Sequence, residues 1–106
     1  MRLSTEEITG ITQALNPHIT EPSTLYLYGS RVDDQRRGGD IDLLILTSKN
    51  EREALMKKKH ILLCDIKEKI GDQRIDLTIA NQEDADKEPF LKMILEEAVV
   101  LSELPS

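Results

Sequence analysis

The sequence contains few of the residue types that several common functions require. Its 106 residues include one cysteine, no tryptophan and three aromatic side chains, Tyr26, Tyr28 and Phe90. Three aromatics are too few for the stacking platform on which proteins bind single-stranded nucleic acid. The single Cys64 cannot form an internal disulfide, which is typical of a reducing compartment. Its apolar neighbours predict a buried thiol on a helix.

Long apolar segments and an excess of positive charge are also absent. The apolar runs, such as residues 43–46, are about four residues long, whereas a helix that crosses a bilayer needs about 20. The N-terminus has no apolar core and carries Glu6 and Glu7, so it does not resemble a signal peptide. Fourteen Lys and Arg against 20 Asp and Glu give a net charge of −6, which repels a phosphate backbone. We therefore expect a cytoplasmic protein without direct DNA binding or membrane contact.

The length of the chain limits its organisation. A chain of 106 residues is long enough to bury one hydrophobic core and too short for two. We therefore expect a single domain that spans residues 1–106. Its first helix is predicted over 5–16, because Ser4 and Glu7 form a capping box at its start. Pro17 ends this helix, since proline lacks a donor and restricts the residue before it.

Three segments have the pattern of β-strands. Residues 24–28 are rich in β-formers and are followed by Gly29. Residues 40–47 form an apolar run whose charged residues stand only at its first and third positions. The segment 30–39 between these two strands is polar and predicts a loop. Residues 74–80 alternate with a period of two, which predicts one buried face and one polar face.

The remaining segments predict two further helices. Ser48 and Glu51 form a second capping box, which begins a long helix that Gly71 terminates. Residues 81–88 are predicted to form an acidic loop. Pro89 suits the first turn of a last helix with an apolar core face. The residues of that face are Phe90, Leu91, Ile94, Leu95 and Ala98.

Three carboxylates carry the strongest chemical signal. Asp40 and Asp42 are two residues apart on one predicted strand, so their side chains leave the same face of the sheet. Asp76 lies on the polar face of another strand and joins them if the two strands pair. Such a cluster repels itself unless a divalent ion that prefers oxygen ligands lies among the acids. The pattern therefore predicts that Asp40, Asp42 and Asp76 bind Mg²⁺ or Mn²⁺.

A glycine and a serine after the first predicted strand suit an anion. Gly29 lets the backbone approach a phosphate closely, the next N–H groups can point at it, and the Ser30 hydroxyl adds a donor. The acids begin ten residues after Ser30. One loop can therefore hold the end of a triphosphate while the acids hold the metal beside it.

Together these residues resemble the DNA polymerase β-like nucleotidyltransferases, in particular their small stand-alone members, the minimal nucleotidyltransferases. The family pattern is an apolar residue and Gly-Ser, a gap, Asp-x-Asp, and a later carboxylate between apolar residues on another strand. It is present here as Tyr28-Gly29-Ser30-Arg31, Asp40-Ile41-Asp42-Leu43 and Ile75-Asp76-Leu77. The resemblance covers essentially the whole chain. It implies an α/β fold of the α+β type, with a small mixed β-sheet and helices packed on one face.

The resemblance also implies an activity and roles for the residues. The activity is transfer of a nucleoside monophosphate, AMP from ATP, to a hydroxyl, with pyrophosphate as the leaving group. The three acids would hold two metal ions, and Asp76 would complete the ligand set of the ion that activates the acceptor. Gly29 and Ser30 would hold the β- and γ-phosphates. Arg31 either reaches a phosphate as well or anchors the turn to a carbonyl or carboxylate.

No residues remain for a domain that binds the acceptor, so another molecule must present the hydroxyl. In the minimal members, that molecule is typically a helical toxin of the HEPN family, and the nucleotidyltransferase is the antitoxin that modifies its tyrosine. The resemblance therefore implies a HEPN-type toxin as the partner, in a homo- or hetero-oligomer. The acidic composition is compatible with docking a basic partner.

Other interpretations remain open. The chain could be a non-catalytic antitoxin that silences its partner by occlusion, or a small-molecule adenylyltransferase, which the lack of a second domain disfavours. The acids could also have structural roles only. The first two would then cap a loop or pair with Arg36 and Arg37. Asp76 would pair with Arg74 or a lysine.

Overall fold

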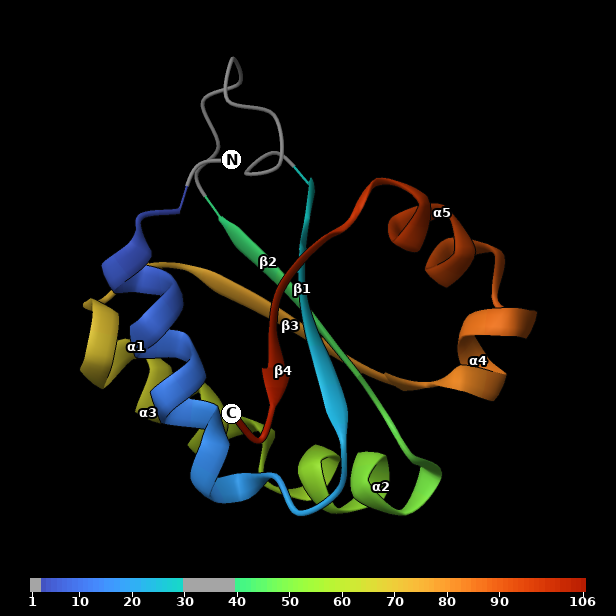
Figure 1. Ribbon diagram of the computed structural model, residues 1–106, viewed down its shortest axis with the longest axis horizontal. Helices are drawn as coiled ribbons and strands as arrows, with labels where there is room; N and C mark the ends of the chain where they lie inside the picture. Colours follow the sequence, from blue (N-terminus) through green and yellow to red (C-terminus); the bar gives the residue numbers. More distant parts are fainter. Residues whose placement is uncertain (1–2, 30–39) are drawn as a thin grey trace.

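The computed structural model of the chain describes residues 3–29 and 40–106, and Figure 1 shows its elements in sequence colours. The helices are α1 (Thr5–Leu15), the 3-10 helix η1 (Asn16–His18), α2 (Lys49–Lys57), α3 (Lys59–Ile70), α4 (Gln82–Lys87) and α5 (Pro89–Glu97). The strands are β1 (Ser23–Tyr28), β2 (Ile41–Thr47), β3 (Ile75–Asn81) and β4 (Val99–Leu104). A search of the described ranges finds no helix with the length and apolar character to cross a bilayer.

The four strands form one mixed sheet with the order β3-β2-β1-β4. β2 and β3 run parallel, whereas β1 is antiparallel to both of its neighbours. A parallel pair needs a long crossover connection, which α2 and α3 supply between β2 and β3. The strand order makes β1 and β2 the two interior strands. The end of β1 and the start of β2 lie at the same end of the sheet, where the predicted site residues are.

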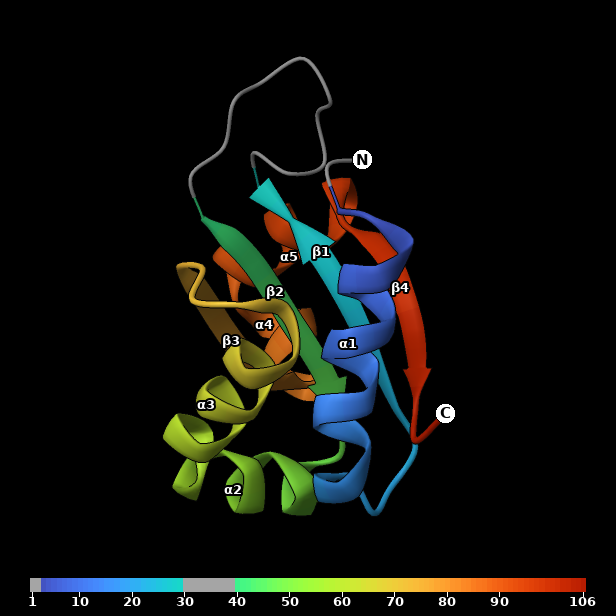
Figure 2. The same ribbon diagram turned by 90° about the vertical axis from the view of Figure 1, so that its left-hand side faces the viewer.

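One face of the sheet carries the main hydrophobic core. Alternate residues of β1 and β2, such as Leu25, Leu27, Leu43 and Ile45, are fully buried on this face. Because side chains alternate across a strand, every second residue points to this core. α1 and α3 lie side by side over it (Figure 2), and Ile11 of α1 is among its buried residues.

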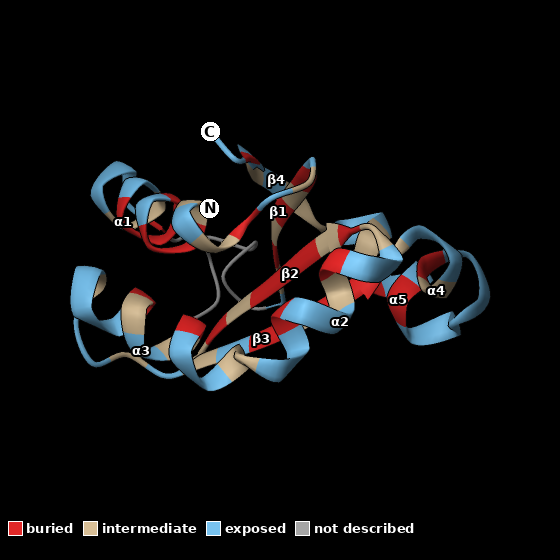
Figure 3. Cartoon of the chain, turned by 90° about the horizontal axis from the view of Figure 1, so that it is seen from below, coloured by how far each residue is buried: buried red, intermediate tan, exposed pale blue. Residues whose placement is uncertain are grey.

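The other face carries a second, smaller core. It comprises Leu44 of β2, Ala80 of β3, and Leu91 and Ile94 of α5. Seen from below, α4 and α5 lie on the opposite side of the sheet from α1 and α3 (Figure 3). The predicted mixed sheet with packed helices is confirmed, but the helices cover both faces rather than one. The difference matters because α5 lies on the face that carries the predicted acids.

α1 begins as the sequence predicts. The Ser4 hydroxyl accepts a hydrogen bond from the Glu7 N–H, and the Glu7 carboxylate accepts one from the Ser4 N–H, both at 3.0 Å. This capping box satisfies two of the donors that a helix leaves free at its start. The helix ends one residue earlier than predicted, because η1 follows with Pro17 in its first turn.

The second predicted capping box is only half formed. The Ser48 hydroxyl accepts from the Glu51 N–H at 3.1 Å, but the Glu51 carboxylate does not return to Ser48. It accepts three hydrogen bonds from another segment, from the N–H and hydroxyl of Thr20 and from the N–H of Glu21, at 2.6–2.9 Å. Glu51 is 3% exposed, so this carboxylate joins the start of α2 to the segment before β1.

The long helix predicted after Ser48 is two helices. α2 ends at Lys57 and α3 begins at Lys59, with Lys58 in a non-helical conformation between them. The apolar positions Leu55 and Leu62 are both fully buried, and the lysines between them make no part of the core. The chain can therefore turn at Lys58 without loss of core contacts, and the turn lets α3 pack against α1.

The C-terminal quarter differs most from the prediction. Asn81 caps α4, its side chain accepting from the Asp84 N–H at 2.7 Å, where the sequence predicted a loop. β4 follows α5, and the prediction missed this strand because it pairs with β1, far away in the sequence. Phe90 was assigned to the core face and is 56% exposed. Cys64 is also exposed rather than buried, since the core residues of α3 are Leu62 and Ile66.

Candidate functional site

The predicted acids lie at one end of the sheet, where β1, β2 and β3 meet. Tyr28 of β1 is opposite Asp42 of β2, and Asp42 is opposite Asp76 of β3. Register partners on neighbouring strands project from the same face. This row therefore lies on the face that α5 partly covers, since Leu44, two residues after Asp42, packs in the smaller core.

Asp42 is the electrostatic centre of the row. Burial raises the pKa of its carboxyl above the ordinary value, and the negative charges of Asp76 and Asp40 raise it further. Desolvation and like charges both disfavour the ionised form of a carboxyl group. A cation at this point would reverse both effects, so the site has the charge arrangement of a cation-binding position.

The acids fit a divalent metal ion in part. Asp42 and Asp76 are adjacent, whereas Asp40 lies 3.8 Å from an Arg74 guanidinium nitrogen in an exposed ion pair. Among residues 3–29 and 40–106, no three His, Cys, Asp or Glu side chains are grouped so that they could hold a metal together. The expected convergence of all three acids is therefore not preformed. Two carboxylates remain a suitable donor set, because Mg²⁺ is usually bound by one or two carboxylates together with substrate phosphates and water.

The alternative structural pairing is also resolved for Arg74. Asp76 was expected to pair with Arg74 or a lysine if the acids had structural roles, but the ion pair of Arg74 is with Asp40. The contact is long and exposed, and such surface pairs contribute about 0–1 kcal/mol. Asp40 can therefore turn from Arg74 towards a ligand at little cost. Arg36 and Arg37 lie outside the described residues.

Gly29 directly follows β1 and lies against Asp42. Its φ is +77°, in the left-handed region that only glycine adopts freely. A Cβ atom at this position would collide with the Asp42 carboxylate. The backbone is thus bare where the predicted phosphate and the metal-binding acid meet. The other predicted nucleotide-binding residues, Ser30 and Arg31, lie outside the described part of the chain.

Tyr28 is a site residue that the sequence analysis did not assign a role. Its hydroxyl lies 3.3 Å from the Thr78 hydroxyl, so the side chain reaches from β1 across β2 to β3. Burial raises the pKa of the Tyr28 phenol, the hydrogen bond with Thr78 lowers it in part, and the nearby carboxylates raise it again. The signal in the sequence was the period of two in β3, which places Thr78 on the same face as Asp76.

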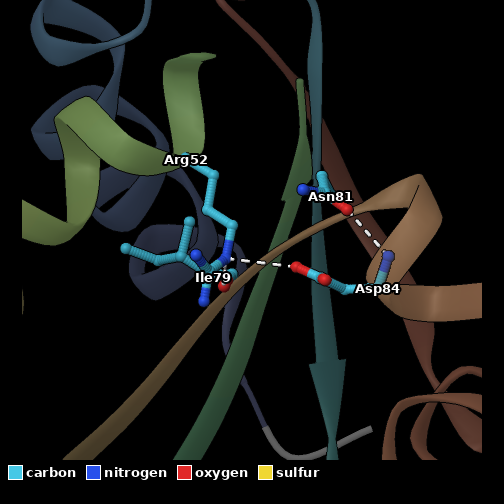
Figure 4. Close-up of polar contacts among 4 residues, drawn as sticks. All are labelled: Arg52, Ile79, Asn81 and Asp84. Atoms are coloured by element: carbon cyan, nitrogen blue, oxygen red, sulfur yellow. Dashed lines mark hydrogen bonds and ion pairs between the residues drawn. The ribbon is translucent and has the colours of Figure 1, made fainter. Parts of the chain in front are cut away.

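The far end of β3 is fixed to α2 and α4. Arg52 of α2 donates from Nε to the Ile79 carbonyl at 3.0 Å and lies 3.4 Å from the Asp84 carboxylate (Figure 4). Asn81 caps the same short helix at Asp84. These contacts hold α4 against β3. Because α5 follows directly, they also place α5 over the site face.

A cavity of about 230 Å³ lies between the end of β1 and α5. Its lining residues are Tyr28, Gly29, Phe90, Met93, Ile94 and Glu97. α5 lies beside the end of β1 in Figure 1, on the side of β1 away from α1 and α3. The cavity therefore adjoins the glycine that contacts Asp42.

The site can now be compared with known families. Residues 9–104 match the family described as "Polymerase beta, Nucleotidyltransferase". The matched segment contains all four strands, Gly29 and the three acids. The chain therefore belongs to this nucleotidyltransferase family, and the predicted fold class is confirmed. A comparison with curated proteins found no match.

Proposed function

We propose that the protein transfers AMP from ATP to a hydroxyl group of a partner protein, with Mg²⁺ or Mn²⁺ as the cofactor. The observation that carries the proposal is the register pair of Asp42 and Asp76 beside the bare backbone of Gly29. Two adjacent carboxylates beside a backbone segment without a side chain suit phosphoryl chemistry with a divalent ion. Membership of the nucleotidyltransferase family supports the same reaction class.

The acids of the site have distinct roles in this reaction. Asp42 and Asp76 would hold the metal, and Asp40 would join them when it leaves Arg74. A bound divalent ion supplies charge neutralisation for the triphosphate and for the attacking and leaving oxygens. The acceptor oxygen attacks the α-phosphorus in line, the bond to the β-phosphate breaks, and pyrophosphate leaves. Asp76 is exposed and takes the proton of the acceptor hydroxyl.

The phosphates are held by the turn after β1. Gly29 brings backbone without a side chain up to the Asp42 carboxylate, and Ser30 and Arg31 would supply donors to the phosphate chain. We place the reaction in the cytoplasm, in keeping with the single, unpaired Cys64.

The acceptor is proposed to be a helical toxin of the HEPN type, which this chain would silence as an antitoxin. The net charge of −6 supports docking to a basic partner. In this proposal the partner presents the hydroxyl, because residues 9–104 form the nucleotidyltransferase domain itself. The antitoxin could silence its partner either by transferring a nucleotide to it or by covering its active site. The experiment below distinguishes these two mechanisms.

The test uses the purified protein with Mg²⁺, ATP labelled at the α-phosphate, and a co-expressed helical partner. We expect label on the partner, loss of transfer in Asp42→Asn, and an intact complex in that variant. Asp72→Asn is the matched control, because Asp72 is 98% exposed and is not part of the site. Label transfer that survives Asp42→Asn contradicts the assigned role. A silenced partner without any label would favour occlusion.

A further inference from the structure

The cavity beside Gly29 lies on one particular side of the acids. β1 supplies Tyr28 and Gly29 to its wall, and the rest of the lining comes from α5. In the sheet, β2 lies between β1 and β3, and the Tyr28 side chain crosses β2 to reach Thr78 on β3. An occupant of this cavity is therefore next to Gly29 and to the Tyr28 ring.

We propose that this cavity holds the base of the nucleotide whose phosphates lie at Gly29. The inference rests on the proposed nucleotidyltransferase function and adds the position and chemistry of base recognition. The cavity begins at Gly29, so a nucleotide that bends at its α-phosphate can place its β- and γ-phosphates at this glycine and its base in the cavity. The acceptor then approaches from the β3 side, where Asp76 is exposed.

The walls of the cavity suit a flat ring. Phe90 and Met93 are 56% and 58% exposed and lie three residues apart, on one face of α5. Ile94 is 5% exposed and closes the cavity from the side of the smaller core. Large apolar side chains that are exposed to solvent at the mouth of a cavity indicate a binding site for a ligand. An aromatic ring and a thioether both give favourable contacts to the face of a base.

Tyr28 forms a fixed wall opposite α5. Its hydroxyl is 3.3 Å from the Thr78 hydroxyl, so the ring is held at both its backbone and its outer end. A side chain that is already ordered loses little freedom when a ligand binds. The tyrosine therefore links the cavity on β1 to the strand that carries Asp76.

Glu97 gives the cavity a polar edge that distinguishes bases. Its carboxylate can only accept hydrogen bonds when it is ionised. Adenine presents an amino group where hypoxanthine presents a carbonyl oxygen, and cytosine differs from uracil in the same way. The cavity therefore favours bases with an exocyclic amino group, because a carbonyl oxygen facing Glu97 would be repelled.

The first test separates base binding from phosphate binding. The dissociation constants of ATP and of inorganic tripolyphosphate are measured by calorimetry in Mg²⁺, for the native chain and for Phe90→Ala. We expect Phe90→Ala to weaken ATP at least about fivefold, the low end for loss of base stacking. Tripolyphosphate should be unaffected. Ile61→Ala is the matched control, since Ile61 is 42% exposed and lies on α3, remote from the cavity.

The outcomes distinguish the two proposals. If the native chain binds neither ATP nor tripolyphosphate, the proposed function fails, and the base site fails with it. If the native chain binds both and Phe90→Ala binds ATP as tightly as the native chain, the base site alone is overturned. Met93→Ala provides the same comparison should Phe90→Ala not fold, because Met93 lines the same cavity and is equally exposed.

The second test addresses the polar edge. We expect the native chain to bind ATP more tightly than inosine triphosphate, and Glu97→Gln to reduce that preference about tenfold, the effect of one hydrogen bond to a charged group. An amide both donates and accepts, so it tolerates either base. Glu96→Gln is the control, because Glu96 precedes it on α5 but does not line the cavity. An unchanged preference in Glu97→Gln would overturn the role of Glu97.

Discussion

Gly29 and Asp42 are packed so closely that a Cβ atom on the glycine would overlap the carboxylate. We therefore expect Gly29→Ala to lose ATP binding. It should also lower the free energy of unfolding by at least about 1–2 kcal/mol, the cost of a left-handed conformation for an L-residue. Urea denaturation and calorimetry measure the two effects.

The control for this substitution is Gly71→Ala. Gly71 also has a positive φ, of +97°, but nothing lies within 4 Å of its Cβ position. It should show the loss of stability without the loss of binding. A Gly29→Ala protein that binds ATP like the native chain would contradict the proposed phosphate position.

Asp42→Asn should make the protein more stable while abolishing its activity. The native pKa of Asp42 is raised by burial and by the charges of Asp76 and Asp40. The carboxyl group therefore holds its proton more tightly in the folded than in the unfolded state. Its contribution to stability is fully present below pH 3.8 and is lost as the pH rises through the pKa of the folded state. At pH 7 we expect a gain of about 0.2–1 kcal/mol, the range for cross-strand charge pairs.

The stability gain is measured as a difference between native chain and variant at several pH values. The difference should grow from pH 3 to neutrality, because only the native chain carries the repelling charge. Asp72→Asn, at an exposed position, should show no such trend. If Asp42→Asn is less stable than the native chain at neutral pH, repulsion between Asp42 and the other two carboxylates is not the dominant effect.

Glu51→Gln should destabilise the protein by about 1–3 kcal/mol, the cost of impairing hydrogen bonds to a buried charged group. Burial acts to raise the pKa of Glu51, but hydrogen bonds from Thr20 and Glu21 and the charge of Lys58 outweigh it and lower the pKa. This group therefore stabilises the fold above pH 4.5, and the contribution is lost as the pH falls through the folded pKa.

Thermal melts from pH 7 down to pH 3 check this dependence. The native chain should lose more stability on acidification than Glu51→Gln. Glu53→Gln is the control, because Glu53 is exposed on the same helix and should match the native chain. Equal acid sensitivity in the native chain and Glu51→Gln would show that other groups dominate.

Arg52→Lys should loosen α4 although the positive charge is retained. The Nε of Arg52 donates to the Ile79 carbonyl, and lysine has no donor at that position. We expect a loss of about 1 kcal/mol and faster hydrogen exchange in α4. Arg74→Lys is the control, since Arg74 makes only an exposed pair at 3.8 Å. Unchanged exchange in α4 would mean that Asn81 alone holds the helix.

The local pattern of the sequence predicted the strands of the site and the face on which its acids lie. The alternation in β3 and the strand after Asp40 are properties of single segments, and both are present in the structure, although β2 begins at Ile41 rather than at the predicted Asp40. The sequence predicted that Asp76 joins these acids if the two strands pair, whereas the register that sets Asp42 opposite Asp76 is known only from the structure. The position of Asp40 did not follow, because it depends on a competing contact with Arg74.

Features that depend on distant partners were not predictable in this way. β4 exists because it pairs with β1, and its own residues also fit the end of a helix. Glu51 bonds to Thr20 rather than to its own helix start, which no local capping pattern contains. Phe90 was assigned to the core because it is large and apolar, yet its neighbour Leu91 fills that position.

The place of β4 in the sheet has a consequence for synthesis on the ribosome. β1 (Ser23–Tyr28) is synthesised before α2, α3, β3, α4 and α5, and only after them comes β4 (Val99–Leu104), one of its two neighbouring strands. Until then, the backbone leading to Gly29 is paired on only one edge and is open to wrong pairing. A nascent chain therefore acquires its complete sheet only after β4 has been synthesised, and until then one edge of β1 can pair with other molecules.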